Sequence, residues 1–233
     1  MKSYQIHLIR HGETDANLKG QYVGITDIPL STSGLKSLKE LDKKYKYPGA
    51  TAFFTSPLKR CIQTMNALYP NVNATIIDGL KECSFGDWEG KTANQLKNNP
   101  KFKEWLNDSQ NTSPPNGESG MLFTHRICST FENLVLSLMK SGTTQAVVVT
   151  HGGVIMTLLA AYGLPRANPF DWIVEPGHGY SIRITPGLWM RDMVCEVYSK
   201  IPVNFKDENN SEQILNLARE AANRAYGDKD KIN

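Results

Sequence analysis

The sequence predicts an α/β fold, a three-layer sandwich in which a mainly parallel central sheet is flanked by helices. Segments typical of strands alternate along the chain with amphipathic helical segments, the pattern of a sheet whose strands are joined by helices. Residues 146–150 form a continuous valine-rich run, as expected of a strand buried on both faces. The chain has 233 residues, of which 40% are hydrophobic and 21% charged, so it can form a full core and is ordinary in composition.

Three strands and two helices are expected in the first eighty residues. The spacing of Leu35, Leu38 and Leu41 places them on one face of an amphipathic helix. Ser56 followed by Pro57 is typical of an N-cap and a first helical residue. The expected strands are Tyr4–Arg10, Thr51–Thr55 and Ala74–Ile77, and the expected helices are Ser33–Lys44 and Pro57–Leu68.

The second half of the chain contains the clearest helical pattern. Apolar residues recur there every three or four positions, at Phe123, Ile127, Phe131, Leu134 and Leu138. Residues 79–115 show no regular pattern apart from two short helical segments. The remaining expected elements are the strands Ala146–Thr150, Gly179–Ile184 and Met190–Tyr198, the helices Gly153–Tyr162 and Glu212–Ala225, and two short helices near Ala93–Asn98 and Lys101–Leu106.

Charge, cysteine spacing and hydropathy exclude several classes of protein. The net charge is only +3, although residues 1–60 carry ten basic and five acidic side chains, so neither nucleic acid nor a membrane is expected as a partner. The four cysteines form no C-x-x-C pair, which argues against a zinc ribbon or a disulfide scaffold. Neither a signal peptide nor a membrane-spanning stretch is visible, so we expect a cytoplasmic protein.

Polar residues stand at the ends of three predicted strands. Arg10 ends the first strand and His11 follows it, Arg60 lies on the first turn of the helix after the second, and His151 follows the valine-rich strand. Because ligands collect outside the carboxyl ends of strands in α/β sheets, we expect these side chains to converge on one pocket. Two guanidiniums and the N-termini of the two following helices suit a phosphoryl group.

Two histidines beside two arginines suit phosphoryl transfer in particular. One imidazole could attack phosphorus and form a phosphohistidine while the other binds the equatorial oxygens. The arginines disfavour protonation of the neighbouring imidazoles and keep the nucleophile neutral near pH 7. Gly12, which has no Cβ, would let the backbone approach the phosphate. The leaving oxygen needs an acid, and the best candidate is Glu82, in a loop that mixes acids, aromatics and glycines.

Four motifs together resemble the histidine phosphatase (phosphoglycerate mutase-like) superfamily. They are Arg-His-Gly-Glu-Thr from Arg10, followed by Asn17, then Ser-Pro-Leu-x-Arg-Cys-x-Gln-Thr from Ser56, Leu-x-Glu-x-x-Phe-Gly-x-Trp-Glu-Gly from Leu80, and Val-x-Thr-His-Gly-Gly from Val148. The motifs occur in the family's order, and the resemblance covers residues 4–160. It implies the phosphoglycerate mutase-like fold.

The resemblance also assigns a role to each matching residue. It makes His11 the phosphorylated nucleophile and Glu82 the proton donor, with His151 as the second phosphate-binding imidazole. The catalytic set implied is His11, Glu82, His151, Arg10 and Arg60, and the phosphate-binding set is Arg10, Gly12, Asn17, Arg60, His151 and Gly152. The family needs neither metal nor another cofactor, and no His, Asp and Glu cluster with ligand spacing occurs in this sequence.

The loop after Glu82 resembles the α-ribazole phosphatase branch and its broad-specificity relatives. Phe85-Gly86-Asp87-Trp88, followed by the run from Pro114 to Ser119, implies a metal-independent phosphomonoesterase acting on a small phosphorylated metabolite, with α-ribazole 5′-phosphate as one candidate. We expect one domain over 1–233, with 83–120 as a substrate-facing insertion and about 203–233 as a helical tail. A phosphoglycerate mutase using the same site and a catalytically silent phospho-ligand-binding module are the alternatives, and the oligomeric state is open.

Overall fold

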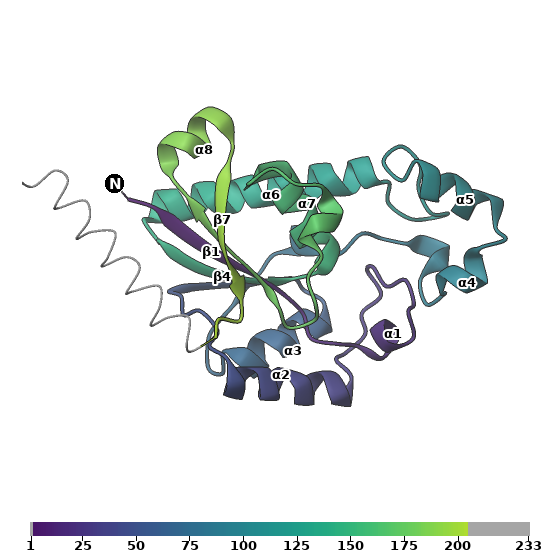
Figure 1. The fold of residues 1–233 in the computed structure, drawn as a ribbon, viewed down its shortest axis with the longest axis horizontal. Coiled ribbons are helices and arrows are strands. Elements are labelled where there is room, and N and C mark those ends of the chain that lie inside the picture. The colour runs from purple at the N-terminus through teal and green to yellow at the C-terminus, as the bar shows by residue number, and fades with distance from the viewer. Residues whose placement is uncertain (1, 205–233) are drawn as a thin grey trace, which may run out of the picture.

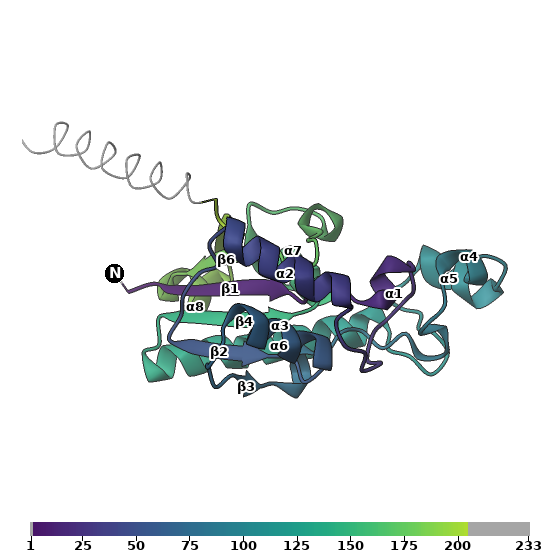
Figure 2. The same ribbon diagram turned by 90° about the horizontal axis from the view of Figure 1, so that it is seen from below.

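The computed structural model describes residues 2–204, and its centre is a seven-stranded sheet with helices on both faces (Figures 1 and 2). The strands lie side by side in the order β3-β2-β4-β1-β6-β7-β5. They are β1 (Tyr4–Arg10), β2 (Ala52–Thr55), β3 (Thr75–Ile76), β4 (Gln145–Thr150), β5 (Gly163–Leu164), β6 (Gly179–Ile184) and β7 (Cys195–Ile201).

The half of the sheet that bears the predicted site is parallel. β1 pairs with β4, β4 with β2, and β2 with β3, all in parallel register, so that Arg10 lies beside Thr150. β6 is antiparallel to β1 and β7 is antiparallel to β6, while the short β5 is parallel to β7. The prediction of a mainly parallel sheet is confirmed, and the ends of β1, β2 and β4 share one edge.

Two groups of helices cover the two faces of the sheet, and a third group, α1, α4 and α5, forms a separate lobe (Figures 1 and 2). In both views α2 and α3 lie on one face of the sheet and α6 and α7 on the other (Figures 1 and 2). The helices α1, α4 and α5 lie beyond the carboxyl ends of β1, β2 and β4 (Figure 2). The helices are α1 (Asp15–Leu18), α2 (Thr32–Lys44), α3 (Lys59–Leu68), α4 (Ala93–Leu96), α5 (Pro100–Asn107), α6 (Gly120–Ser141), α7 (Gly152–Tyr162) and α8 (Pro186–Asp192), with the 3-10 helices η1 (Asp78–Leu80), η2 (Gly86–Trp88) and η3 (Pro169–Trp172).

The strand β4 contributes to the hydrophobic cores on both faces of the sheet. Ala146 and Val148 face the core shared with α6 and α7, and Val147 and Val149 face the core shared with α2 and α3. This alternation explains why the whole run is apolar, and it confirms the expectation of a strand buried on both faces. The five apolar residues that predicted the long helix are all buried against the sheet: Phe123, Ile127, Phe131, Leu134 and Leu138.

The ends of α6 follow from local chemistry. The Ser119 hydroxyl accepts a hydrogen bond from the backbone N–H of Leu122 and so caps the first turn. The helix ends at Gly142, whose φ of 74° lies in the left-handed region that glycine adopts without strain. These two signals fix a helix of 22 residues, long enough to run from the sheet to the lobe (Figure 1).

Two expected elements differ in the structure, and a third cannot be compared with it. The strand expected over Met190–Tyr198 is wrong in its first half, because Pro186 starts the helix α8 and β7 begins only at Cys195. The helix expected from Pro57 begins at Lys59, with Leu58 as its N-cap. The Ser56 hydroxyl accepts a long hydrogen bond of 3.5 Å from Leu58 N–H and forms a shorter one of 2.8 Å with His151 Nε2. The final expected helix, over 212–225, lies outside the described residues.

The lobe has an aromatic core of its own. Trp88 is 1% exposed and packs with Leu96 and Phe102, while Phe85 and Trp105 cover them. The aromatic residues of the loop after Glu82 therefore hold the lobe together. No helix within residues 2–204 is long and apolar enough to cross a membrane.

Candidate active site

The end of β1 places Arg10 and His11 at the sheet edge. The backbone N–H of His11 donates to Thr150 O at 2.9 Å, which ties it to the end of β4. The backbone N–H of Arg10 donates to His178 O at 2.8 Å. The strand register thus brings His11 next to the turn that carries His151.

The His11 ring is held in one tautomer. Its Nδ1 lies 2.6 Å from Gly12 O, and because a carbonyl oxygen only accepts, Nδ1 carries the proton. Nε2 of the neutral ring then bears the lone pair that a nucleophile needs. Burial, with the positive charge of Arg60 as the next cause, holds the pKa of His11 well below its usual value of 6.5. His11 is therefore neutral at neutral pH, with the lone pair on Nε2.

His151 faces His11 across the site. The two ring centroids are 5.2 Å apart and the rings meet edge to face. His151 is fully buried, its Nε2 forms a hydrogen bond of 2.8 Å with Ser56 Oγ, and the Cys61 thiol lies 3.5 Å from the same nitrogen. Burial is the main cause that keeps its pKa well below 6.5. The structure brings the two predicted histidines together.

The two predicted arginines are held by backbone carbonyls. Arg60 donates from Nη1 to Thr26 O at 2.9 Å and from Nη2 to Gly24 O at 2.6 Å. Arg10 donates from Nη1 to Val174 O at 2.7 Å. The Arg10 Nε is buried and has no hydrogen-bond partner within residues 2–204. Such an orphaned cationic donor fits an anionic oxygen supplied by a ligand.

The Glu82 carboxyl is seated at the N-terminus of α7. Its Oε1 accepts from the backbone N–H of Cys83 and its Oε2 from the backbone N–H of Gly153, both at 2.9 Å. Burial raises the pKa of Glu82 above 4.5, against the smaller opposing effect of these two hydrogen bonds. A carboxyl with a raised pKa keeps its proton to higher pH, as a general acid requires.

The remaining predicted phosphate ligands differ in what they do. The Gly12 N–H donates to Thr64 Oγ1 at 2.9 Å, and a Cβ at Gly12 would lie 2.6 Å from Leu38 Cδ1, so packing under α2 explains this glycine better than phosphate contact. A Cβ at Gly152 would lie 3.4 Å from Arg10 Nε, so Gly152 lies against the guanidinium. Asn17 accepts from the backbone N–H of Thr14 through Oδ1, which leaves its Nδ2 to donate to a ligand.

Comparison with known proteins decides the family. The family model of the histidine phosphatase superfamily (branch 1) matches residues 6–195. The chain belongs to the histidine phosphatase superfamily. The family resemblance stated from the four motifs is thereby confirmed.

The relatives that match over most of their length at 30% identity or more are named as phosphatases. The chain is 31% identical to the adenosylcobalamin/alpha-ribazole phosphatase of Salmonella typhimurium over 189 residues, which cover 78% of this chain and 92% of that protein. The crystal structure of the alpha-ribazole phosphatase from Shigella flexneri matches with a TM-score of 0.72 at 26% identity, over 83% of this chain and 94% of that one. A phosphoglycerate mutase structure from Bacillus anthracis matches over 85% of this chain and 92% of that one with a TM-score of 0.70, but at 22% identity it shows the fold alone. The family and these relatives support a phosphatase, a hydrolase of phosphate esters.

Sequence reasoning missed two groups that hold this histidine phosphatase site together. The Glu89 carboxylate accepts from the backbone N–H groups of Ile25 and Thr26, so it fixes the loop whose carbonyls hold Arg60. Its position in the Trp-Glu-Gly motif was the available signal. Ser56 was expected to be a helix cap, and its bond to His151 could not be read from the chain.

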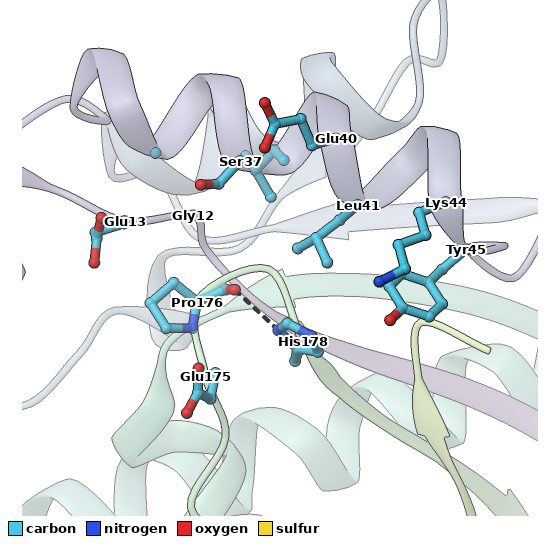
Figure 3. A pocket seen from close by; sticks show the side chains of 12 residues that line it. Gly12, Glu13, Ser37, Glu40, Leu41, Lys44, Tyr45, Glu175, Pro176 and His178 are labelled. Carbon is cyan, nitrogen blue, oxygen red and sulfur yellow. Dashed lines mark hydrogen bonds between the residues drawn. The ribbon is translucent and has the colours of Figure 1, made fainter. Parts of the chain in front are cut away.

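A cavity of about 400 Å³ lies beside the site, between α2 and residues 175–178 (Figure 3). Its walls include Glu13, Lys44, Glu175 and His178, and of the predicted site residues only Gly12 borders it. This cavity is therefore separate from the catalytic groups. The segment at residues 175–178 also contacts the main chain of the site, because the Gly177 N–H donates to Arg10 O at 3.1 Å. Within residues 2–204 no cluster of three or more His, Cys, Asp and Glu could hold a metal ion.

Proposed function

We propose that the protein is a phosphomonoesterase that hydrolyses a small phosphorylated metabolite through a phosphohistidine at His11. The observation that carries this proposal is the state of the His11 ring, whose Nδ1 proton is held by Gly12 O while Nε2 keeps its lone pair. The nearness of His151, of the buried Arg60 guanidinium and of the partly buried Arg10 supports the same conclusion. Asn17 Nδ2 and the turn at Gly152 complete the proposed phosphate-binding set.

In the first step, His11 Nε2 attacks phosphorus in line with the leaving oxygen. The N–P bond forms as the P–O bond to the alcohol breaks, and the leaving oxygen takes the proton of the Glu82 carboxyl. Arg10, Arg60 and His151 hold the three equatorial oxygens and stabilise the charge spread over them. Burial favours the protonated form of Glu82 that this step needs, because it raises the pKa of the carboxyl.

In the second step, water hydrolyses the phosphohistidine. The Glu82 carboxylate left by the first step takes a proton from the water as its oxygen attacks phosphorus. The N–P bond breaks, its electron pair returns to Nε2, and the site regains a neutral His11 and a protonated Glu82. The two steps together consume one water and release alcohol and phosphate.

The first candidate substrate is α-ribazole 5′-phosphate. A relative named for this activity is 31% identical and is covered over 92% of its length. Residues 83–120, which include α4 and α5, lie beyond the strand ends (Figure 2), and we propose that this insertion faces the substrate. The single-domain organisation and the cytoplasmic location stay predictions from the sequence.

A phosphatase panel tests the substrate and the reaction class. The panel holds α-ribazole 5′-phosphate, nucleoside monophosphates and sugar phosphates, each with and without EDTA, and phosphate release is measured. We expect one class to exceed the others in kcat/KM, with no loss in EDTA. Phosphate release abolished by EDTA would contradict the proposal. Interconversion of 3-phosphoglycerate and 2-phosphoglycerate faster than phosphate release would make the protein a mutase, and tight binding without turnover would make it a silent binding module.

A further inference from the structure

Arg126, a residue of α6, forms hydrogen bonds with the main chain around Glu82. Arg126 Nη1 donates to Gly79 O and to Lys81 O, both at 2.9 Å, and Nη2 donates to Glu82 O at 3.3 Å. One guanidinium thus bonds three backbone carbonyls, two of them before the proposed acid and the third its own. Because this segment has no strand or long helix of its own, Arg126 supplies the order that regular structure would otherwise provide.

Glu118 anchors the same guanidinium. Arg126 Nε donates to Glu118 Oε1 at 3.0 Å and Nη2 to Glu118 Oε2 at 2.7 Å, so the pair is bidentate. The two side chains are 29% and 18% exposed, which keeps the pair partly shielded from water. The backbone N–H of Glu118 also donates to Ser84 O at 2.9 Å. The pair therefore joins α6, the segment of Glu82 and the end of the 83–120 insertion.

The carboxyl group of Glu82 is fixed by groups other than Arg126. Its carboxyl is received by the N–H groups of Cys83 and Gly153, and Arg126 touches only its main chain. A side chain that must reach a leaving oxygen within a few tenths of an ångström needs a fixed backbone as well as a fixed carboxyl. The planar fork of an arginine can bond several carbonyls and a carboxylate at once, which a lysine cannot do.

We infer that Arg126, anchored by Glu118, is a positioning residue for Glu82, and this inference rests on the proposed function. It acts through the main chain at residues 79–82 and makes no contact with the substrate. Its loss should therefore reduce proton donation to the leaving group and leave phosphoryl binding intact. A rival role exists, because Arg126 also borders a cavity of about 390 Å³ with Lys81 and Ser84, where it could bind a substrate directly.

Arg126→Gln separates these roles by the leaving group. We expect kcat/KM for an alkyl phosphate to fall about 30-fold or more, because a poor leaving group needs the acid, and kcat/KM for p-nitrophenyl phosphate to fall less than about 3-fold. KM for the alkyl phosphate should change little. Equal losses on both esters, no loss on either, or a loss confined to KM would overturn the inference.

A matched control and a second variant guard against a general loss of structure. Arg183→Gln breaks an exposed ion pair with Glu196 on β6 and β7, far along the chain from Glu82, and should change neither ester. If Arg126→Gln fails to fold, Glu118→Gln removes only the anchor, and it should show the same selective loss, about 3- to 10-fold. A non-selective loss in that variant would also overturn the inference. Acid-labile labelling of the wild type reports the proposed function separately, so the two can fail independently.

Discussion

The contact between Gly153 and Glu82 predicts how the enzyme responds to a single methyl group. In Gly153→Ala the new Cβ would lie 2.5 Å from Glu82 Oε1 and 3.0 Å from Cδ. An ordinary contact needs 3.4 Å, so the carboxyl must move by about 0.9 Å or give up its hydrogen bond to the Gly153 N–H. Either change moves the proposed acid out of the position that its two hydrogen bonds define.

The size of the effect follows from the displacement. A misplacement near 1 Å costs about 100-fold in rate, and a general acid contributes about 100- to 10,000-fold. We expect kcat/KM for an alkyl phosphate to fall about 100-fold and kcat/KM for p-nitrophenyl phosphate to fall less than about 3-fold. Alanine is favoured over glycine in helices by up to about 1 kcal/mol, so α7 itself should not be weakened.

Steady-state kinetics on both esters measures this selectivity, and Gly187→Ala is the matched control. Gly187 occupies the second position of α8, as Gly153 does in α7, and a Cβ there meets no atom within 4 Å. The control should retain full activity on both esters. Wild-type activity of Gly153→Ala on the alkyl phosphate would refute the reasoning, as would equal losses on the two esters at an unchanged melting temperature.

Three further predictions concern pH and packing. Because burial lowers the pKa of His11 and raises that of Glu82, the acid limb of kcat/KM should lie below pH 6.5 and the basic limb above pH 4.5. Glu82→Gln should remove the basic limb, and a basic limb that persists would argue against Glu82 as the acid. Burial lowers the pKa of His7 from 6.5 to about 4. As the pH falls, His7 is therefore protonated in the unfolded chain before it is protonated in the folded protein. Up to about 3 kcal/mol of the free energy of unfolding is lost between pH 6.5 and 4. Urea unfolding of His7→Gln at pH 7 and 4.5 should show a smaller acid loss than the wild type, and an identical loss would contradict this. Gly24→Ala would place a methyl group against Cys83 O, so both esters should slow together as the loop that holds Arg60 moves; a loss on one ester alone would contradict this.

The part of the site that sequence could predict lies at strand ends. Arg10 and His151 follow β1 and β4, and because these strands are parallel neighbours their ends meet wherever the sheet forms. The fold followed in the same way from local patterns. The apolar run of β4 and the spacing along α6 each reflect burial against the sheet, which one segment reveals by itself.

The parts that sequence could not predict depend on contacts between distant residues. Arg126 is an ordinary polar residue of a helix until the fold brings residues 79–82 against it. The bond from Ser56 to His151 joins residues 95 positions apart, and at 2.8 Å it is shorter than the 3.5 Å bond that Ser56 Oγ accepts from Leu58 N–H. The helix α8 was missed because Met190 and the residues after it resemble a strand, while the decisive proline lies four residues earlier.

The central claim is that His11 carries the phosphoryl group during turnover. Rapid acid-free quenching after mixing with a ³²P-labelled monoester, followed by peptide mass spectrometry, measures it most directly. We predict an alkali-stable, acid-labile phosphoryl group on His11 that forms within one turnover, decays with phosphate release and is absent from His11→Ala. Label on another residue, label that persists in His11→Ala, or full turnover with no label at any time would contradict the account.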